Sequence, residues 1–198
     1  MISNITNHVV QNLLQANIID QEEIEVYEFG IETFFSDVFN LITTAMIGIL
    51  IGQFWECFIF QVTFISLRSF AGGYHASSEW KCWILSNAMV TGVLLLSRRL
   101  PMWFGPGVGL FLLLAAAGVI LLLAPVENEN NPLDSDEVES YKRRVRMMAL
   151  ISVLSGILLY GLSSSFFWII VLAVLSVALS LVIGTCAGKW KRKHKSEG

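Results

Sequence analysis

Residues 147–188 read MMALISVLSGILLYGLSSSFFWIIVLAVLSVALSLVIGTCAG and contain no Asp, Glu, Lys or Arg. A single helix that crosses a bilayer needs about 20 apolar residues, so this run is long enough for two helices. Residues 100–126 form a second uncharged run. Of the 198 residues, 55% are hydrophobic and 15% are charged, whereas soluble domains carry about 25% charged residues. The sequence therefore predicts an all-α fold, a polytopic helical membrane protein.

The breaks between apolar runs predict about six transmembrane helices. The breaks are glycine, proline or polar segments, near residues 52, 72, 98–101, 127–146 and 161–165. The predicted spans lie near residues 36–52, 54–70, 80–97, 103–124, 147–164 and 166–187. The first two spans are short and contain Asp37 and Glu56, so a re-entrant hairpin is an alternative for them. We expect one membrane domain over residues 1–198: N-terminal helices (1–35), a transmembrane bundle (36–187) and a basic tail (188–198).

Two amphipathic helices are predicted before the first span. In the first, over residues 2–16, an apolar face is formed by Ile2, Ile5, Val9, Leu13 and Ala16. The second begins with Asp20 as its N-cap. It places Ile24, Tyr27, Ile31 and Phe34 on one face and Glu22, Glu25, Glu28 and Glu32 on the other. The acidic face suits packing against a partner or a substrate helix, and the membrane surface is the alternative.

The distribution of charge predicts the orientation of the chain. The formal net charge is −3, which argues against nucleic acid as a partner. Five bases between Lys189 and Lys195 predict a cytoplasmic tail held at anionic membrane lipid. The positive-inside rule places segment 127–146 on the same side, because it contains four bases: Lys142, Arg143, Arg144 and Arg146. An even number of spans then puts the loop after residue 72 in the cytoplasm, with Arg98 and Arg99 as outward-facing exceptions.

That loop contains the most concentrated polar sequence of the membrane region, RSFAGGYHASSEWKC from Arg68 to Cys82. His75 and Cys82 are a base and a thiol, the minimum parts of an activated thiolate nucleophile. Ser77 or Ser78 is expected to cap the third span, which puts Cys82 about one turn into that helix. The positive end of the helix dipole and a protonated His75 would both favour the thiolate.

Structural explanations for the same residues remain open. A single His at an interface is often a polar anchor, and a single Cys often fills a core. Cys57 and Cys186 lie inside apolar runs, where we expect each to be a small, soft hydrophobic residue. Arg68 is either an anchor that snorkels or a group that binds a carboxylate or a developing oxyanion. His75 and Cys82 are fewer ligands than the three or four that zinc takes, so we expect no metal and no cofactor.

Two segments of the chain resemble a known family. Arg68, Gly72-Gly73, His75-Ala76 and Cys82 match the pattern R-x-x-x-G-G-x-H-A-x-x-x-x-x-C of the accessory gene regulator protein B (AgrB) family. Residues 124–133, APVENENNPL, resemble that family's A-P-V-E/D-x-x-N-K-P-L segment, with Asn131 in place of the usual Lys. The order of both segments and the overall length also agree with the family.

The resemblance implies a function. Members are membrane cysteine endopeptidases of Gram-positive bacteria that process a precursor peptide, AgrD, into a cyclic autoinducing peptide for quorum sensing. On this chain it implies Cys82 as nucleophile, His75 as base, and Arg68, Gly72 and Gly73 as supporting residues. The reaction would pass through a thioester on Cys82 and close a thiolactone or lactone ring. No third catalytic residue is evident; Glu79, Asn87 and Glu56 are the candidates to orient His75.

Further expectations concern partners and alternatives. The acidic tail of an AgrD-like precursor would be attracted by Lys142, Arg143, Arg144 and Arg146, or these bases would only fix the topology. Small residues in the last two spans are compatible with a homodimer: Ser152, Ser155, Gly156 and Ser180. A small transporter or exporter subunit is the main alternative, suggested by Asp37 and Glu56 within apolar runs. A non-catalytic membrane scaffold is the other.

Overall fold

The computed structural model describes residues 2–16, 18–72, 79–126, 135–162 and 164–195 of the chain. Within these ranges the chain forms seven α-helices and one 3-10 helix and contains no strand. The helices are α1 (Ile2–Gln15), η1 (Gln21–Glu23), α2 (Ile24–Ile51), α3 (Phe54–Ala71), α4 (Glu79–Trp103), α5 (Pro106–Leu123), α6 (Ser135–Leu162) and α7 (Ser164–Lys195).

The six predicted spans coincide largely with the helices α2 to α7, and the fold class is confirmed. Within the described residues, four of these helices are long and apolar enough to cross a membrane: α2, α4, α6 and α7, so the count of six transmembrane helices stays a prediction. The apolar part of α5, Gly107–Leu123, is shorter. α2 has 28 residues, and at 1.5 Å per residue it is about 42 Å long, which is enough to cross a bilayer.

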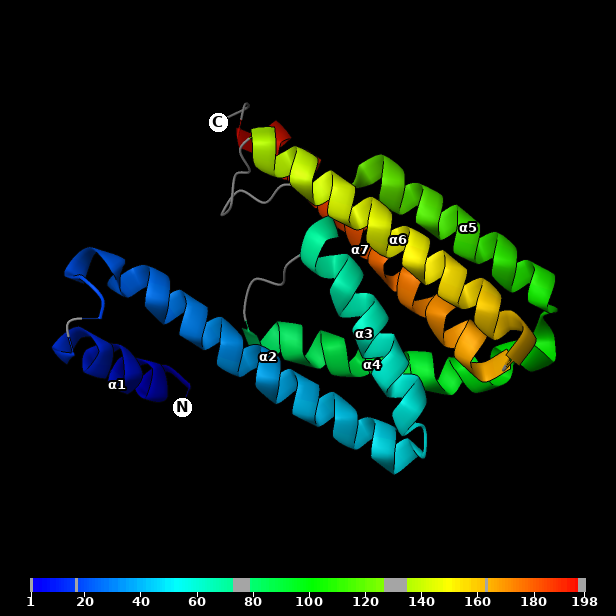
Figure 1. Ribbon diagram of the computed structural model, residues 1–198, viewed down its shortest axis with the longest axis horizontal. Helices are drawn as coiled ribbons and strands as arrows, with labels where there is room; N and C mark the ends of the chain where they lie inside the picture. The colour runs from blue at the N-terminus through cyan, green and yellow to red at the C-terminus, as the bar shows by residue number, and fades with distance from the viewer. Residues whose placement is uncertain (1, 17, 73–78, 127–134, 163, 196–198) are drawn as a thin grey trace.

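The central helix of the fold is α7, which packs against α3, α4, α5 and α6. Figure 1 shows α5, α6 and α7 side by side, with α3 and α4 crossing at one end of this group. Phe167 and Trp168 at the start of α7 are 1% and 2% exposed. Because α7 is surrounded on several sides, it supplies more residues to the buried core than any other helix.

Gly156 of α6 lies at a close contact between α6 and two other helices of the same chain. A Cβ at this position would lie 2.6 Å from Leu113 Cδ2 of α5 and 3.5 Å from Ile170 Cγ2 of α7. Ser152, one turn earlier, is also buried. These small side chains let α5, α6 and α7 approach one another within one chain, and the homodimer stays a prediction.

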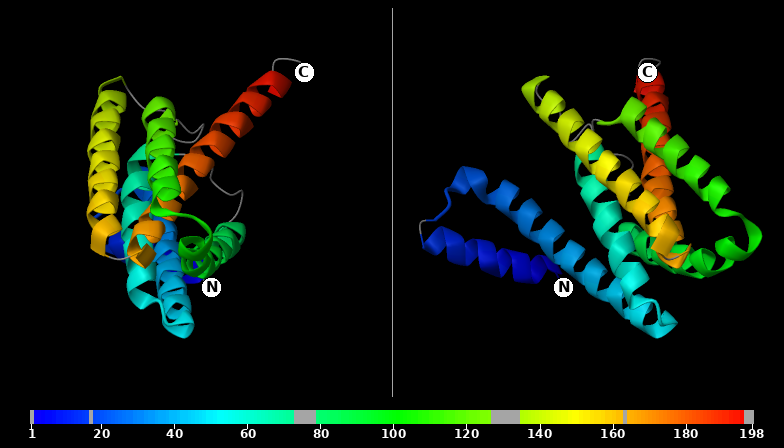
Figure 2. Two further views of the ribbon diagram at one scale, coloured as in Figure 1. Left: turned by 90° about the vertical axis from the view of Figure 1, so that its right-hand side faces the viewer. Right: turned by 45° about the vertical axis from the view of Figure 1, so that its right-hand side comes forward.

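The N-terminal part folds as a hairpin of α1 on α2, to one side of the helices around α7 (Figure 2). Thr6 and Val10 are fully buried, while Ala16 is exposed. The buried face of α1 is therefore rotated from the predicted one, because contact with α2 selects it rather than apolarity alone. Glu23 Oε2 accepts a 3.1 Å hydrogen bond from the backbone N–H of Asp20, which supports the predicted helix start.

Several helices extend beyond the predicted boundaries. α2 continues through residues 35 and 36 without a break, since residues 31–47 contain no Gly or Pro. It ends at Gly52, whose φ is 71°, and Arg98 Nη2 donates a 2.9 Å hydrogen bond to the Ile51 carbonyl there. α6 and α7 extend into their basic segments, where Lys and Arg are good helix formers. α4 continues through Pro101 to Trp103.

Candidate active site

The stretch from Arg68 to Cys82 joins two helices. Arg68 lies in the last turn of α3, and Cys82 is the fourth residue of α4, so its predicted place in the first turn is confirmed. The Cys82 side chain is exposed. Gly73 and His75 lie outside the described residues, as does the side chain of Glu79.

Arg68 is half-buried at the end of α3 and is held from two directions. Its Nη1 donates a 3.2 Å hydrogen bond to the Gly72 carbonyl and a second one to Ser180 Oγ of α7. The Cys82 side chain of α4 also interacts electrostatically with this guanidinium. Arg68, which is hydrogen-bonded to Ser180 of α7, is thus coupled electrostatically to Cys82. Sequence reasoning placed Ser180 in a helix interface and missed this role, because its partner is 112 residues away.

The two segments that resemble the family meet in space. The backbone N–H of Val126 donates a 3.0 Å hydrogen bond to the Ala71 carbonyl. Gly72 and Val126 form an isolated parallel bridge, and Ala124–Pro125 is a cis peptide bond. Gly72 has a φ of 74° and a ψ of −148°, a conformation that only glycine adopts readily. A Cβ on Gly72 would also meet the Val126 carbonyl oxygen.

Aromatic rings surround the start of α4 near Cys82. Trp80 and Trp83 stack with centroids 4.9 Å apart, and Phe39 of α2 stacks on Trp83 at 6.0 Å. Trp83 Nε1 also donates a 3.2 Å hydrogen bond to Thr43 Oγ1 of α2. This contact fixes the first turn of α4 against α2. Trp80 and Trp83 are three positions apart, and this spacing on a helix would have predicted that their side chains meet.

The candidate orienting residues are separated by the fold. Asn87 lies between α2 and α4, where its Nδ2 donates a 2.7 Å hydrogen bond to the Trp83 carbonyl. Its Oδ1 is buried and accepts no hydrogen bond from the residues that the structure describes. Glu56 lies in the first turn of α3, about 18 Å along the helix from Arg68 at 1.5 Å per residue. Glu56 is therefore at the wrong end of α3 to act beside Cys82.

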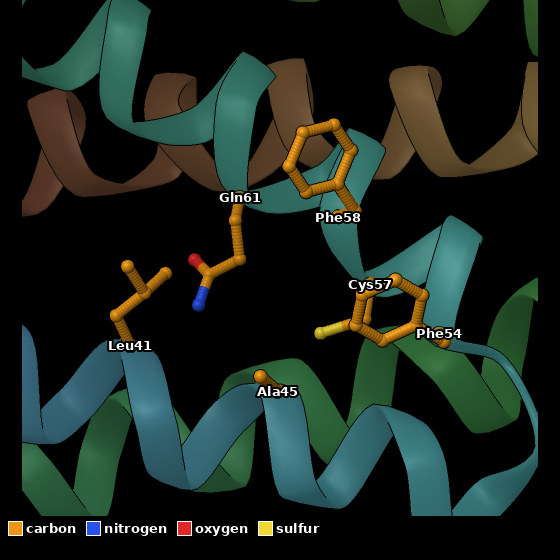
Figure 3. Close-up of a pocket in the computed structure, with 6 residues that line it drawn as sticks. All are labelled: Leu41, Ala45, Phe54, Cys57, Phe58 and Gln61. Carbon is orange, nitrogen blue, oxygen red and sulfur yellow. The ribbon is translucent and has the colours of Figure 1, made fainter.

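The other two cysteines differ from each other. Cys57 is buried, and its Sγ donates a 3.3 Å hydrogen bond to the Thr44 carbonyl of α2. Figure 3 shows it beside a small cavity of about 40 Å³ between α2 and α3, lined by Leu41, Ala45, Phe54, Cys57, Phe58 and Gln61. The prediction of Cys57 as core filling is confirmed. Cys186 of α7 is exposed and lies at the end of the apolar part of that helix, so its role as a small hydrophobe stays a prediction.

The four bases of segment 127–146 lie on one helix rather than in a loop. Lys142, Arg143, Arg144 and Arg146 are all exposed on α6. The Arg144 guanidinium lies 5.3 Å from the centre of the Phe70 ring, at the end of α3. Lys142 and Arg146 line a cavity of about 200 Å³ beside the end of α5.

Comparisons with known proteins agree with this arrangement. The family described as Accessory gene regulator B matches residues 2–181. A protein of Clostridium perfringens named as AgrB-like is 24% identical over 194 residues, covering 93% of this chain and 87% of the relative. Protein FsrB of Enterococcus faecalis is 24% identical over 196 residues, covering 93% and 78%. An AgrB-like protein of Lactiplantibacillus plantarum is 26% identical over 181 residues, covering 89% and 86%.

No solved structure matches the chain. The family match covers both partners of the hydrogen bond between Ala71 and Val126, and it includes both segments that carried the resemblance. The protein is therefore a helical membrane protein that belongs to the Accessory gene regulator B family.

Proposed function

We propose that the protein is a membrane cysteine endopeptidase that cleaves an AgrD-like precursor through a thioester on Cys82 and promotes its cyclisation. Family membership supports a part in quorum-sensing peptide processing. The finer proposal rests on one observation: the Arg68 guanidinium is anchored by α7 and the Gly72 carbonyl within electrostatic range of Cys82.

The proposed reaction begins with attack of the Cys82 thiolate on the carbonyl carbon of the scissile bond. Arg68 offers its positive charge to the oxyanion that develops on that carbonyl. His75 protonates the departing amine, so the C-terminal part of the precursor leaves and the N-terminal part stays on Cys82 as a thioester.

Ring closure is the second proposed step. A Cys or Ser side chain of the bound fragment gives its proton to His75 and attacks the thioester carbonyl. This step forms a thiolactone or lactone, releases the Cys82 thiolate and restores the protonated His75. Exchange of a thioester with a thiol breaks one thioester bond and forms another, so its free-energy change is small. Ring closure to a thiolactone therefore needs no cofactor. Hydrolysis by water competes with closure, which makes a site at a partly dry membrane surface an advantage. Gly72 and Gly73 are proposed to let the substrate backbone approach closely.

We further propose that bases of α6 attract the acidic tail of the precursor. Arg143 and Arg144 are exposed and do not line the cavity beside α5, and Arg144 lies against Phe70, two residues before Gly72. Lys142 and Arg146 would add to the positive electrostatic potential that attracts this tail. Charge reversal at Arg143 and Arg144 is expected to weaken substrate binding without loss of insertion. Unchanged cleavage by the variant with reversed charges at Arg143 and Arg144, with an unchanged amount of protein in the membrane, would contradict this proposal.

The test of the peptidase is mass spectrometry of a candidate precursor incubated with the protein in liposomes. Wild type is expected to remove the C-terminal tail, while Cys82→Ala and His75→Ala are expected to leave it intact. Cys186→Ala is the matched control, because Cys186 is the other exposed thiol. Equal cleavage by Cys82→Ala would contradict the proposal and favour the transporter or scaffold alternative.

A further inference from the structure

The cavity beside the end of α5 combines two cations with an apolar wall. It has a volume of about 200 Å³ and is lined by Leu121, Leu122 and Ala124 from the end of α5 and by Lys142, Val145 and Arg146 from α6. Its lining includes no residue of the α3 or α4 segments that carry Arg68 and Cys82. It is therefore separate from the candidate active site.

Lys142 and Arg146 are four positions apart on α6, so they lie on one face of the helix, one above the other. Two like charges in this arrangement repel each other unless an anion lies near both. Among the residues that the structure describes, neither cation has a carboxylate partner within ion-pair distance. An arginine fork and a lysine ammonium that face one cavity are well suited to bind a phosphate group.

The apolar wall identifies where the phosphate would come from. Leu122 is 85% exposed and Leu121 is 48% exposed, at the end of an apolar helix. In a membrane protein such side chains face acyl chains. α5 ends at Leu123, and an apolar helix in a bilayer ends where the hydrocarbon region gives way to the polar region, which would put the two cations at that level. Phospholipids place their phosphates at that level, directly beside their acyl chains.

We propose that this cavity binds the headgroup phosphate of an anionic phospholipid, with its acyl chain along Leu121 and Leu122. The bound lipid would hold the end of α5 against α6. Ala124 lies two residues before Val126, which is hydrogen-bonded to Ala71. The lipid site would therefore support the segment after α5 that is hydrogen-bonded to the end of α3. The proposal does not depend on the proposed peptidase chemistry.

The test is lipid binding to the full chain in neutral detergent, measured by native mass spectrometry with added phosphatidylglycerol or phosphatidylcholine. Wild type is expected to bind phosphatidylglycerol more tightly. Each cation near a membrane surface adds about 1 kcal/mol, or about fivefold, so Lys142→Gln and Arg146→Gln should each weaken binding about fivefold and the double variant about 25-fold. Arg143→Gln removes one charge from the same turns of α6 outside the cavity and should bind like wild type.

Several outcomes would overturn the proposal. Equal weakening by Arg143→Gln would mean a diffuse electrostatic effect rather than a site. Equal binding of phosphatidylcholine would mean that headgroup charge is not recognised. Displacement of the lipid by millimolar inorganic phosphate would mean a free phosphate site, and displacement by an acidic peptide would mean a peptide site. Arg146→Lys keeps the charge but not the guanidinium fork and should bind the lipid more tightly than Arg146→Gln; equal weakening in the two variants, with unchanged helix content, would also contradict the proposal.

Discussion

The backbone N–H of Val126 donates a 3.0 Å hydrogen bond to the carbonyl oxygen of Ala71, which joins the end of α3 to the segment after α5. These residues are 55 positions apart in the sequence. Each belongs to one of the two segments that resemble the family, so the fold brings both to one place. The two segments therefore form one structural unit at the end of α3.

Replacement of Gly72 by Ala tests this junction. The new Cβ would meet the Val126 carbonyl oxygen, and the residue would keep a φ of 74° that alanine adopts only with strain. We expect a stability loss of about 1–3 kcal/mol and loss of precursor cleavage, measured by thermal unfolding in detergent and by mass spectrometry.

Gly92→Ala in α4 is the control for Gly72→Ala, because no heavy atom lies within 4 Å of its added Cβ. This variant should be as stable as wild type or slightly more stable, since alanine favours a helix. An unchanged melting temperature and activity in Gly72→Ala would show that the contact with Val126 is not needed.

Ser180→Ala tests whether α7 positions Arg68. The substitution removes the hydroxyl that accepts the hydrogen bond from Arg68 Nη1. Hydrogen bonds to charged groups contribute about 1.5–3 kcal/mol, so we expect kcat for cleavage to fall by at least about tenfold with little change in KM. Ser180→Thr keeps the hydroxyl and should restore most of the rate.

Ser176→Ala provides the comparison on the same helix. Ser176 Oγ donates only a local 2.8 Å hydrogen bond to the Leu172 carbonyl, one turn away from Ser180. Wild-type kinetics are expected for this variant. If both alanine variants lose activity equally, the effect of Ser180 is on helix packing and Arg68 is not its target.

Gly156→Val tests whether α6 packs against α5 and α7 within one chain. The larger side chain would collide with Leu113 and Ile170. Overpacking of this kind costs about 1–3 kcal/mol, so the melting temperature should fall without a change in oligomeric state. Gly118→Val, at a position with open space around it, should have little effect. Dissociation of a dimer by Gly156→Val would instead place this residue at an interface between chains.

Much of the fold could be predicted from local sequence. The uncharged run 147–188 and the breaks at Gly52 and at residues 161–165 determine helices and turns through hydropathy and local backbone preference, and the structure agrees with them. The ends of α6 and α7 could not be placed, because Lys and Arg extend a helix as readily as they end a span. The buried face of α1 depends on its contact with α2, which a helical periodicity does not contain.

The candidate site also has some features that local sequence predicts and others that only the tertiary fold reveals. The place of Cys82 in the first turn of α4 followed from the residues around it. The contacts of Arg68 with Ser180 and of Ala71 with Val126 connect residues distant in the sequence, so only the tertiary fold reveals them. Glu56 could be placed at the far end of α3, away from Cys82, only once the bounds of that helix were known.

The most direct test of the account is intact-protein mass spectrometry of the enzyme after brief incubation with the precursor and acid quench. We expect an adduct with the mass of the N-terminal precursor fragment, released by hydroxylamine as a thioester is, and present in wild type and Cys186→Ala. The adduct should be absent in Cys82→Ala. Tail removal by Cys82→Ala, or an adduct that maps to Cys186, would contradict the assignment of Cys82 as the nucleophile.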